Sequence, residues 1–175
     1  MEQMKIYIVG CAKTGTTLLR RLFNAFDGLE VSQDEMYLYE FIDSKYNVAK
    51  RHKREMLSSA YEDEAVELQL TKADVNNIKI VYIERNRVDT LKSSNGYVEP
   101  ERYDFVTAQA QRLSNRIDCF VSYEELIKDC NKVQKQIADD LGLKIKYKFS
   151  DYPNFIKEDN LNYGQYRLRK IGEKK

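Results

Sequence analysis

The first 28 residues carry the pattern that most constrains the fold of this chain. A short β-rich run, Lys5-Ile-Tyr-Ile-Val9, ends at a glycine and leads into the loop Gly10-Cys-Ala-Lys-Thr-Gly15. Apolar residues then recur at helical spacing up to Phe26, and Gly28 follows where the C-terminal cap of a helix is expected. A strand, a glycine loop and a helix in this order are typical of the start of a nucleotide-binding α/β domain.

Further short runs predict the other strands of a sheet. Ile78-Lys-Ile-Val-Tyr-Ile83 is nearly continuous in β-branched and aromatic residues, which is typical of a buried parallel strand. Residues 29–32 and 118–121 are shorter stretches that fit strands. The predicted helices begin near residue 88, span about 101–115, follow a capping box at Ser122-Tyr-Glu-Glu125, and end at Gly142. This alternation predicts an α/β fold, a parallel β-sheet flanked by helices in a three-layer sandwich like that of the P-loop nucleotide hydrolases.

The polar parts of the chain complete this outline. Residues 44–65 change from a basic run, Lys50-Arg-His-Lys-Arg54, to an acidic one, Glu62-Asp-Glu64, and we expect a helix there that contributes little to the core. His52 is interpreted as part of a solvated helix face. Residues 151–175 form a polar C-terminal tail after a core of about 150 residues.

Length and composition indicate a single domain over residues 1–175. The 29 Lys and Arg residues balance 28 Asp and Glu, so the bulk charge indicates neither a nucleic acid nor a membrane as partner. No apolar run approaches the roughly 18–20 residues of a spanning helix and no signal-peptide pattern is present, so we expect a cytoplasmic protein. Three cysteines without C-x-x-C spacing and one histidine predict no metal site.

The glycine loop predicts a site for a phosphate-like group. Gly10 to Thr17 has the G-x-x-x-x-G frame, but Thr16 stands where the Walker pattern has lysine, and the lysine lies mid-loop at Lys13. Backbone N–H groups of such a loop, and of the start of the following helix, converge on an anion. We therefore expect Lys13 to lie beside a bound phosphate; a purely structural turn is the alternative.

Three segments, in the same order along the chain, resemble segments of the sulfotransferase family. Lys13-Thr-Gly-Thr-Thr17 is similar to the family's 5′-phosphosulfate-binding loop, P-K-S-G-T-T. The segment Ile80-Val-Tyr-Ile-Glu-Arg-Asn-Arg-Val-Asp-Thr-Leu-Lys-Ser93 resembles the 3′-phosphate-binding element, a strand ending in R-N-P-x-D with a serine eight residues after the arginine. Arg85 and Ser93 fall on these two positions. Val121-Ser-Tyr-Glu-Glu-Leu126 resembles the later Y-E-D-L junction.

The resemblance implies 3′-phosphoadenosine 5′-phosphosulfate (PAPS) as cofactor, with no metal. The phosphosulfate end would be bound by the loop residues Lys13, Thr14, Gly15, Thr16 and Thr17. Arg85 and Ser93 would hold the 3′-phosphate, since a guanidinium offers two parallel donors to a phosphate. The alternative for Arg85 is a surface ion pair with Glu84 or Asp89. Arg87 stands where the family has proline, and we expect it to add a charge near the cofactor.

The resemblance also suggests a catalytic base. Some branches of the family use a glutamate just after the second strand, and Val31-Ser-Gln-Asp-Glu-Met-Tyr-Leu-Tyr39 resembles that segment, with Glu35 on the glutamate. The pKa of Glu35 would need to be raised, and Tyr37, Tyr39 and Phe41 could supply an apolar wall. The competing bases are Asp34, Glu40 and His52. Candidates for a further cofactor contact are Arg167, Arg169 and Lys170.

The implied function is transfer of a sulfuryl group from PAPS to a hydroxyl or amine, with release of adenosine 3′,5′-bisphosphate (PAP). A carbohydrate or small-molecule acceptor is favoured over a protein. Two alternatives stay open. One is a P-loop nucleotide kinase or NTPase, with Glu84 as a carboxylate associated with Mg²⁺. The other is a non-catalytic module that binds PAP or PAPS, because function follows the site and not the fold.

Overall fold

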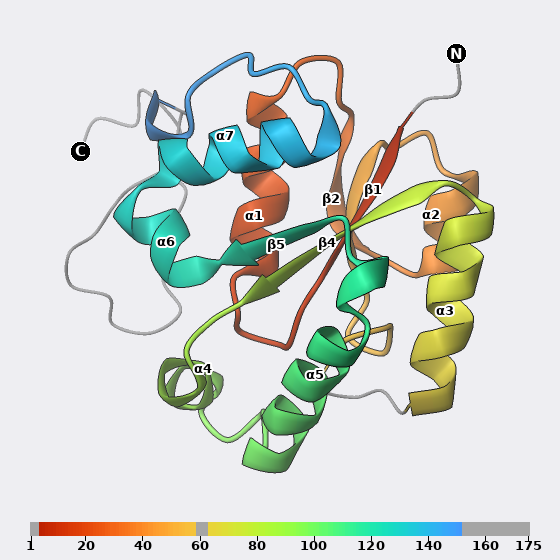
Figure 1. The fold of residues 1–175 in the computed structure, drawn as a ribbon, viewed down its shortest axis with the longest axis vertical. Coiled ribbons are helices and arrows are strands. Elements are labelled where there is room, and N and C mark those ends of the chain that lie inside the picture. Colours follow the sequence, from red (N-terminus) through yellow and green to blue (C-terminus); the bar gives the residue numbers. More distant parts are fainter. Residues whose placement is uncertain (1–3, 59–62, 152–175) are drawn as a thin grey trace.

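The computed structural model describes residues 4–58 and 63–151 (Figure 1). The strands within these ranges are β1 (Lys5–Val9), β2 (Val31–Met36), β3 (Val48–Arg51), β4 (Ile78–Glu84) and β5 (Cys119–Ser122). The α-helices are α1 (Thr16–Leu22), α2 (Leu38–Asp43), α3 (Asp63–Val75), α4 (Arg87–Ser94), α5 (Pro100–Arg112), α6 (Tyr123–Lys128) and α7 (Cys130–Leu141). Short 3₁₀ turns cover Phe23–Ala25, Ser114–Arg116 and Phe149–Asp151.

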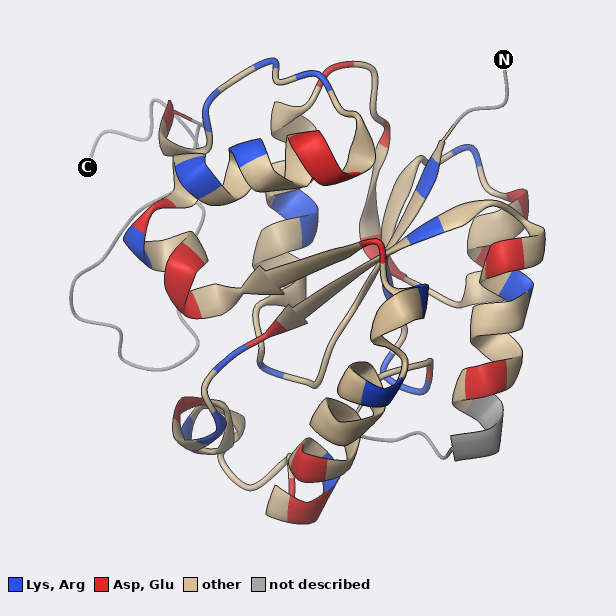
Figure 2. Cartoon of the chain, in the orientation of Figure 1, with Lys and Arg blue, Asp and Glu red and all other residues tan. Residues whose placement is uncertain are grey.

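All paired strands are parallel and follow the order β2-β3-β1-β4-β5. The chain leaves β1 toward β2 on one side of the sheet and leaves β4 toward β5 on the other. The connections after these two neighbouring strands therefore diverge and leave a crevice at their carboxyl ends, which is the usual ligand position in an open parallel sheet. Figure 2 shows basic residues in the segments that follow both strands.

The side chains of β1 alternate between two hydrophobic cores, as the pleat of a strand requires. Ile6 and Ile8 pack with apolar residues of α1, α6 and α7, whereas Tyr7 and Val9 pack with α2, α3 and α5. Figure 1 shows α1, α6 and α7 on one face of the sheet and α3 and α5 on the other. The predicted three-layer α/β fold is confirmed, and β4, α4, α5 and α7 lie close to their predicted positions.

The prediction for residues 44–65 is wrong in its central part. Val48–Arg51 is a strand that lies between β2 and β1 inside the sheet, and Val48 and Ala49 have no exposed surface. Met56 and Leu57 are also buried, so this segment contributes to the core. His52 follows the end of β3 and is not on a helix.

Two other boundaries differ from those expected. The strand expected over 29–32 is Val31–Met36, which places Glu35 within β2 instead of after it. The first helix ends at Leu22 and tightens into the 3₁₀ turn Phe23–Ala25; the backbone becomes extended at Phe26, which bridges to Ile145 in an antiparallel pair. Gly28 lies in the turn before β2 and is not the helix cap.

Ser122 caps α6 by accepting a hydrogen bond from the backbone N–H of Glu125. The reciprocal bond of the predicted capping box is not among the contacts of this described segment, since the Glu125 carboxylate lies near Lys128 and Lys132 instead. The cap therefore has one of its two expected halves.

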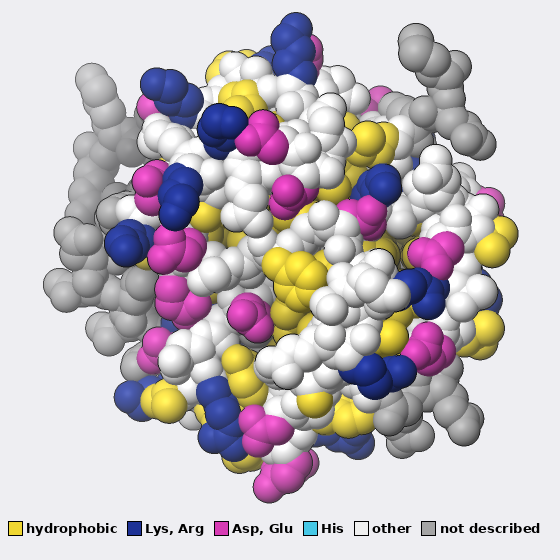
Figure 3. All heavy atoms as spheres, viewed as in Figure 1, with side chains coloured by type: hydrophobic (Ala, Val, Ile, Leu, Met, Phe, Trp, Pro, Cys, Tyr) yellow, Lys and Arg dark blue, Asp and Glu magenta, His cyan; other side chains and the backbone are white. Residues whose placement is uncertain are grey.

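The surface carries both signs of charge, in keeping with a net charge of +1. Figure 3 shows Lys and Arg side chains interspersed with Asp and Glu over one face. None of the helices in the part of the chain that the structure describes is both long and apolar enough to cross a bilayer.

Candidate functional site

A pocket of about 440 Å³ lies where the carboxyl ends of the strands meet the first loop. Its walls come from the loop after β1, from α1, from the ends of β2 and β3, and from the segments after β4 and β5. Seven of the residues predicted for the site line it together: Lys13, Gly15, Thr16, Thr17, Glu35, Arg85 and Ser93. Parallel strands explain the convergence, since their carboxyl ends share one edge of the sheet.

Thr14 is the predicted loop residue that does not line the pocket. Its side chain is fully buried, and its hydroxyl donates to the Cys11 carbonyl at 2.8 Å. It therefore holds the loop closed from within. Burial raises the pKa of the Cys11 thiol to about 11, so this cysteine is an unreactive neighbour of the loop.

The loop needs glycine at position 15, because the backbone there has a positive φ and because Tyr123 leaves no space for a Cβ atom. The φ of Gly15 is 102°, and an added Cβ would lie 2.6 Å from Cδ2 of Tyr123. Lys13 has a φ of 69°, which is uncommon for a residue with a side chain and costs on the order of 1 kcal/mol. The exposed Lys13 amine is thus held at the pocket wall by a backbone conformation that the rest of the loop imposes.

Arg51 at the end of β3 supports the loop from behind. Its side chain is only 4% exposed, and its Nε donates to the Gly10 carbonyl at 2.8 Å. Burial lowers the pKa of the Arg51 guanidinium, but an arginine stays charged inside proteins. A buried positive charge therefore lies beneath the loop that begins at Gly10 and also forms part of the pocket wall.

Arg85 is a buried guanidinium without a carboxylate partner among the described residues. Its side chain lies over the Tyr123 ring, with Cζ 4.5 Å from the centroid, and NH1 makes a long 3.4 Å bond to the Lys13 carbonyl. Within the described ranges its Nε has no hydrogen-bond acceptor. The alternative of a surface ion pair with Glu84 or Asp89 does not hold.

The backbone around Arg85 is firmly anchored. Its carbonyl accepts a hydrogen bond from the Tyr103 hydroxyl at 2.5 Å, and Asn86 caps α4 by accepting from the Val88 N–H at 2.9 Å. Arg87 is the first residue of α4, a position that suits proline but does not require it. Arg87, which was expected to add a charge near the cofactor, does not line the pocket and forms a two-pronged ion pair with Asp104 at the surface.

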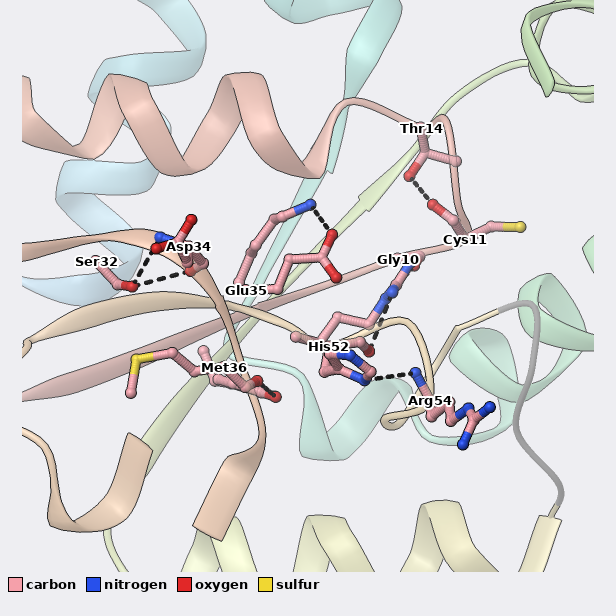
Figure 4. A network of polar contacts seen from close by, with 12 residues as sticks. Gly10, Cys11, Thr14, Ser32, Asp34, Glu35, Met36, His52 and Arg54 are labelled. Atoms are coloured by element: carbon pink, nitrogen blue, oxygen red, sulfur yellow. Dashed lines mark hydrogen bonds and ion pairs between the residues drawn. The ribbon is translucent and has the colours of Figure 1, made fainter. Parts of the chain in front are cut away.

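Glu35 and Lys50 form an ion pair inside the pocket, with Nζ 2.6 Å from Oε1. The two residues are register partners on β2 and β3, so their side chains leave the sheet on the same face. Figure 4 shows the hydrogen bond that Glu35 accepts. Burial alone would raise the pKa of Glu35, but the hydrogen bond and charge of Lys50, with Arg51 and His52, lower it overall.

The apolar wall expected to raise the pKa of Glu35 is therefore a wrong prediction. Tyr39 is 61% exposed, Tyr37 stacks on His52 with centroids 4.0 Å apart, and Phe41 packs in the core beside Tyr7. These side chains are engaged elsewhere, and the charges from β3 decide the ionisation of Glu35 instead.

The three competing bases do not line the pocket. Asp34 is exposed beside Ser32, and the Glu40 carboxylate accepts from the Tyr37 N–H at 3.0 Å at the start of α2. His52 stacks on Tyr37, and its Nδ1 lies 3.4 Å from the Arg54 N–H. Geometry thus favours Glu35 among the four. The candidates for a further cofactor contact, Arg167, Arg169 and Lys170, lie outside the described residues.

The pocket is strongly basic. Among its described lining residues are six cations and one carboxylate, Glu35; the cations are Lys13, Arg21, Lys50, Arg51, Lys53 and Arg85. Sequence reasoning missed Arg21 on α1 and the three cations around the end of β3. The basic run of residues 50–54 was visible, but assigning it to a helix removed it from the pocket.

A comparison of the sequence with protein-family models and with curated proteins found no match. The described residues also contain no group of His, Cys, Asp and Glu side chains that could hold a metal ion. What the site can do therefore follows from its own geometry. It is a basic pocket whose volume is in the range of small-molecule sites, and its described lining includes a glycine loop, one carboxylate and a buried arginine, Arg85, whose Nε has no acceptor.

Proposed function

We propose that this chain is a sulfotransferase that transfers a sulfuryl group from PAPS to a hydroxyl or amine of an acceptor. The observation that carries the proposal is that one pocket contains the Lys13 loop, the Arg85 and Ser93 pair, and the Glu35 carboxylate. These are the positions where the sulfotransferase resemblance requires a phosphosulfate site, a 3′-phosphate site and a base.

The residues of the pocket suit a nucleotide with a 3′-phosphate. Arg85 is a guanidinium only 8% exposed, and its Nε lacks an acceptor among the described residues, which is costly without a bound anion. Ser93 on α4 lines the same pocket, and its hydroxyl is proposed to bind the same anion. The volume of about 440 Å³ is within the range of small-molecule sites, roughly 300–1,000 Å³.

PAPS supplies the activated sulfuryl group when it is bound. Lys13 neutralises charge that develops on the 5′-phosphate as the bond to sulfur breaks, and the N–H groups at the start of α1 lack helical acceptors and can bind the same oxygens. Arg51 keeps this loop in place through Gly10. No metal ion is needed, because fixed cations provide the positive charge.

Glu35 receives the proton of the attacking hydroxyl or amine as the new bond to sulfur forms. The carboxylate is ionised because Lys50 and Arg51 lower its pKa, so it is ready to accept a proton. A proton acceptor must lie within hydrogen-bonding distance of the group that it deprotonates. Lys50 bonds Oε1 of Glu35, so Oε2 is the carboxylate oxygen that would receive this proton.

The Lys50 contact is also the observation that favours a second candidate, a non-catalytic module that binds PAP or PAPS. A carboxylate held by a lysine at 2.6 Å is a weaker base than a free one. Glu35→Gln distinguishes the two functions. It leaves PAP affinity unchanged in both, but it slows PAP release from PAPS about 100-fold or more only in the enzyme.

The kinase or NTPase alternative has less support. Glu84, its candidate carboxylate for Mg²⁺, is exposed and does not line the pocket. The residue after Gly15 is Thr16, whereas the Walker pattern needs lysine there to reach the terminal phosphates.

Calorimetric titration with PAP and with ATP, each with and without Mg²⁺, tests the proposed function. We expect PAP to bind more tightly than ATP, independently of Mg²⁺, and Arg85→Met to weaken PAP at least tenfold. Arg112→Met, which removes an arginine that does not line the pocket, is the matched control and leaves PAP affinity unchanged. Preference for ATP with Mg²⁺ would overturn the proposal.

A further inference from the structure

The cations of the pocket fall into two groups. Lys13 and Arg85 flank the carboxyl ends of β1 and β4, where the proposed nucleotide lies. Lys50 at the end of β3 contacts the proposed base, and Lys53 after β3 and Arg21 on α1 line the same pocket as this pair. The second group lies where the acceptor must approach, because the attacking group has to reach Glu35.

The charges of the described residues on this second side do not cancel. Glu35 is the carboxylate among the described lining residues, and Lys50 already neutralises it at 2.6 Å. The side chains of Arg21 and Lys53 have no hydrogen bond or ion pair among the described residues. Asp34 is near enough to influence Arg20, but Arg20 is itself a buried cation that offsets it.

We infer that the acceptor of this pocket carries an anionic group, a carboxylate or a sulfate, which Arg21 and Lys53 bind beside Glu35. The inference rests on the proposed function, since it concerns the acceptor half of the same pocket. Arg21 on α1 and Lys53 in the turn after β3 are both exposed and both line the pocket that contains Glu35. Two cations from different elements can thus hold one anion while its neighbouring hydroxyl faces the base.

Arg51 also adds to the positive electrostatic potential in the proposed acceptor half of the pocket, and it does so without contacting the acceptor. It is 4% exposed and directed to the Gly10 carbonyl, so its charge is poorly screened by water. A neutral sugar would leave Arg21 and Lys53 only solvated and would gain nothing from this field. An anionic sugar gains from all three charges, which makes the acceptor half selective.

Binding in the presence of saturating PAP tests the inference. The probes are two matched pairs: 4-nitrophenyl β-glucuronide with 4-nitrophenyl β-glucoside, and N-acetylglucosamine 6-sulfate with N-acetylglucosamine. We expect the anionic member of at least one pair to bind about fivefold or more tightly, and the advantage to shrink as salt rises above about 0.15 M. A difference in affinity within the glucuronide pair indicates a carboxylate, and a difference within the 6-sulfate pair indicates a sulfate.

Charge reversal assigns the effect to the two side chains. Arg21→Glu and Lys53→Glu should each abolish the preference while changing PAP affinity less than about threefold. Lys148→Glu is the matched control, since Lys148 is exposed and does not line the pocket, and it should keep the preference. Equal affinity within both pairs, or no binding of any probe, overturns the inference and leaves the proposed function standing. Failure of PAP itself to bind overturns both.

Discussion

Lys50 and Glu35 face each other across neighbouring parallel strands, and their charged atoms lie 2.6 Å apart within the pocket. Lys50 is only 11% exposed in its side chain, whereas Glu35 is 38% exposed. The pair therefore links the ionisation of the proposed base to a cation that can also bind an anionic ligand.

Replacing Lys50 by methionine should raise the pKa of Glu35. Burial already favours the neutral carboxyl, and Lys50→Met removes the hydrogen bond and charge that outweigh this effect. Nuclear magnetic resonance of the Glu35 carboxyl carbon during a pH titration measures the change. Lys53→Met is the control, because Lys53 lines the pocket without bonding Glu35, and it should shift the titration less. An unchanged titration in Lys50→Met would show that the pair does not control the base.

The Glu35 ion pair should make stability depend on pH in a defined direction. The pKa of Glu35 is lower in the folded chain than its ordinary value, so its stabilising contribution is present above about pH 4.3 and disappears as the pH falls through the folded pKa. Urea unfolding of the wild type and Glu35→Gln over this range measures the difference. The two should converge at low pH, and a gap that persists there contradicts the assignment.

Removing the Lys13 amine should abolish turnover. Lys13→Ala removes positive charge from the proposed phosphosulfate site, and we expect PAP release from PAPS to fall about 100-fold or more. Because Lys13 has a φ of 69°, Lys13→Gly serves as a second variant that relieves the backbone and still removes the amine. An equal loss of rate in both variants assigns the effect to the amine. A wild-type rate in either variant would contradict the proposed role of Lys13.

Gly15→Ala should destabilise the chain more than Gly28→Ala. Both glycines have positive φ, but a Cβ on Gly15 would lie 2.6 Å from the Tyr123 ring, whereas a Cβ on Gly28 meets nothing within 4 Å. The shared backbone cost is roughly 1 kcal/mol, and the clash should add about 1–3 kcal/mol at Gly15. Thermal and urea unfolding compare the two. Similar losses would mean that the loop adjusts freely around Tyr123.

Arg85→Met should weaken PAP binding without loss of stability. The Nε of the guanidinium has no acceptor in the described part of the chain, and such a buried donor without a partner destabilises the folded state. Arg85→Met removes this unfavourable free energy, and the gain offsets the loss of the cation–π contact with Tyr123. We expect the free energy of unfolding to stay within about 1 kcal/mol of the wild-type value. A loss of about 3–5 kcal/mol would instead indicate a structural ion pair, as expected when one partner of a buried pair is removed.

The sequence predicted the elements whose patterns are strong and local. The run Ile78 to Ile83 is apolar except for Lys79, and α7 has a largely apolar buried face and is capped by Gly142, so both elements lie close to where they were expected. The glycine loop and Arg85 were recognisable because their spacing along the chain is itself the signal. Their meeting in one pocket followed from the rule for parallel strands.

The strand β3 could not be recognised in the same way. Only Val48 and Ala49 of its four residues are apolar, and a buried strand is normally identified by a longer apolar run. Lys50 and Arg51 are tolerated in the sheet because Glu35 and the Gly10 carbonyl pair with them, and both partners are distant in sequence. For this reason the sequence pattern did not reveal that Lys50, Arg51 and Lys53 line the pocket.

The cations of the pocket differ in how freely they can be changed. Arg51 is bound to the loop and buried, so a substitution there would disturb the fold together with the site. Arg21 and Lys53 are exposed and carry no bond to the framework among the described residues. If the proposed function holds, substitutions at these two positions would alter acceptor choice and leave the proposed nucleotide half intact, so they are the starting points for retargeting this scaffold.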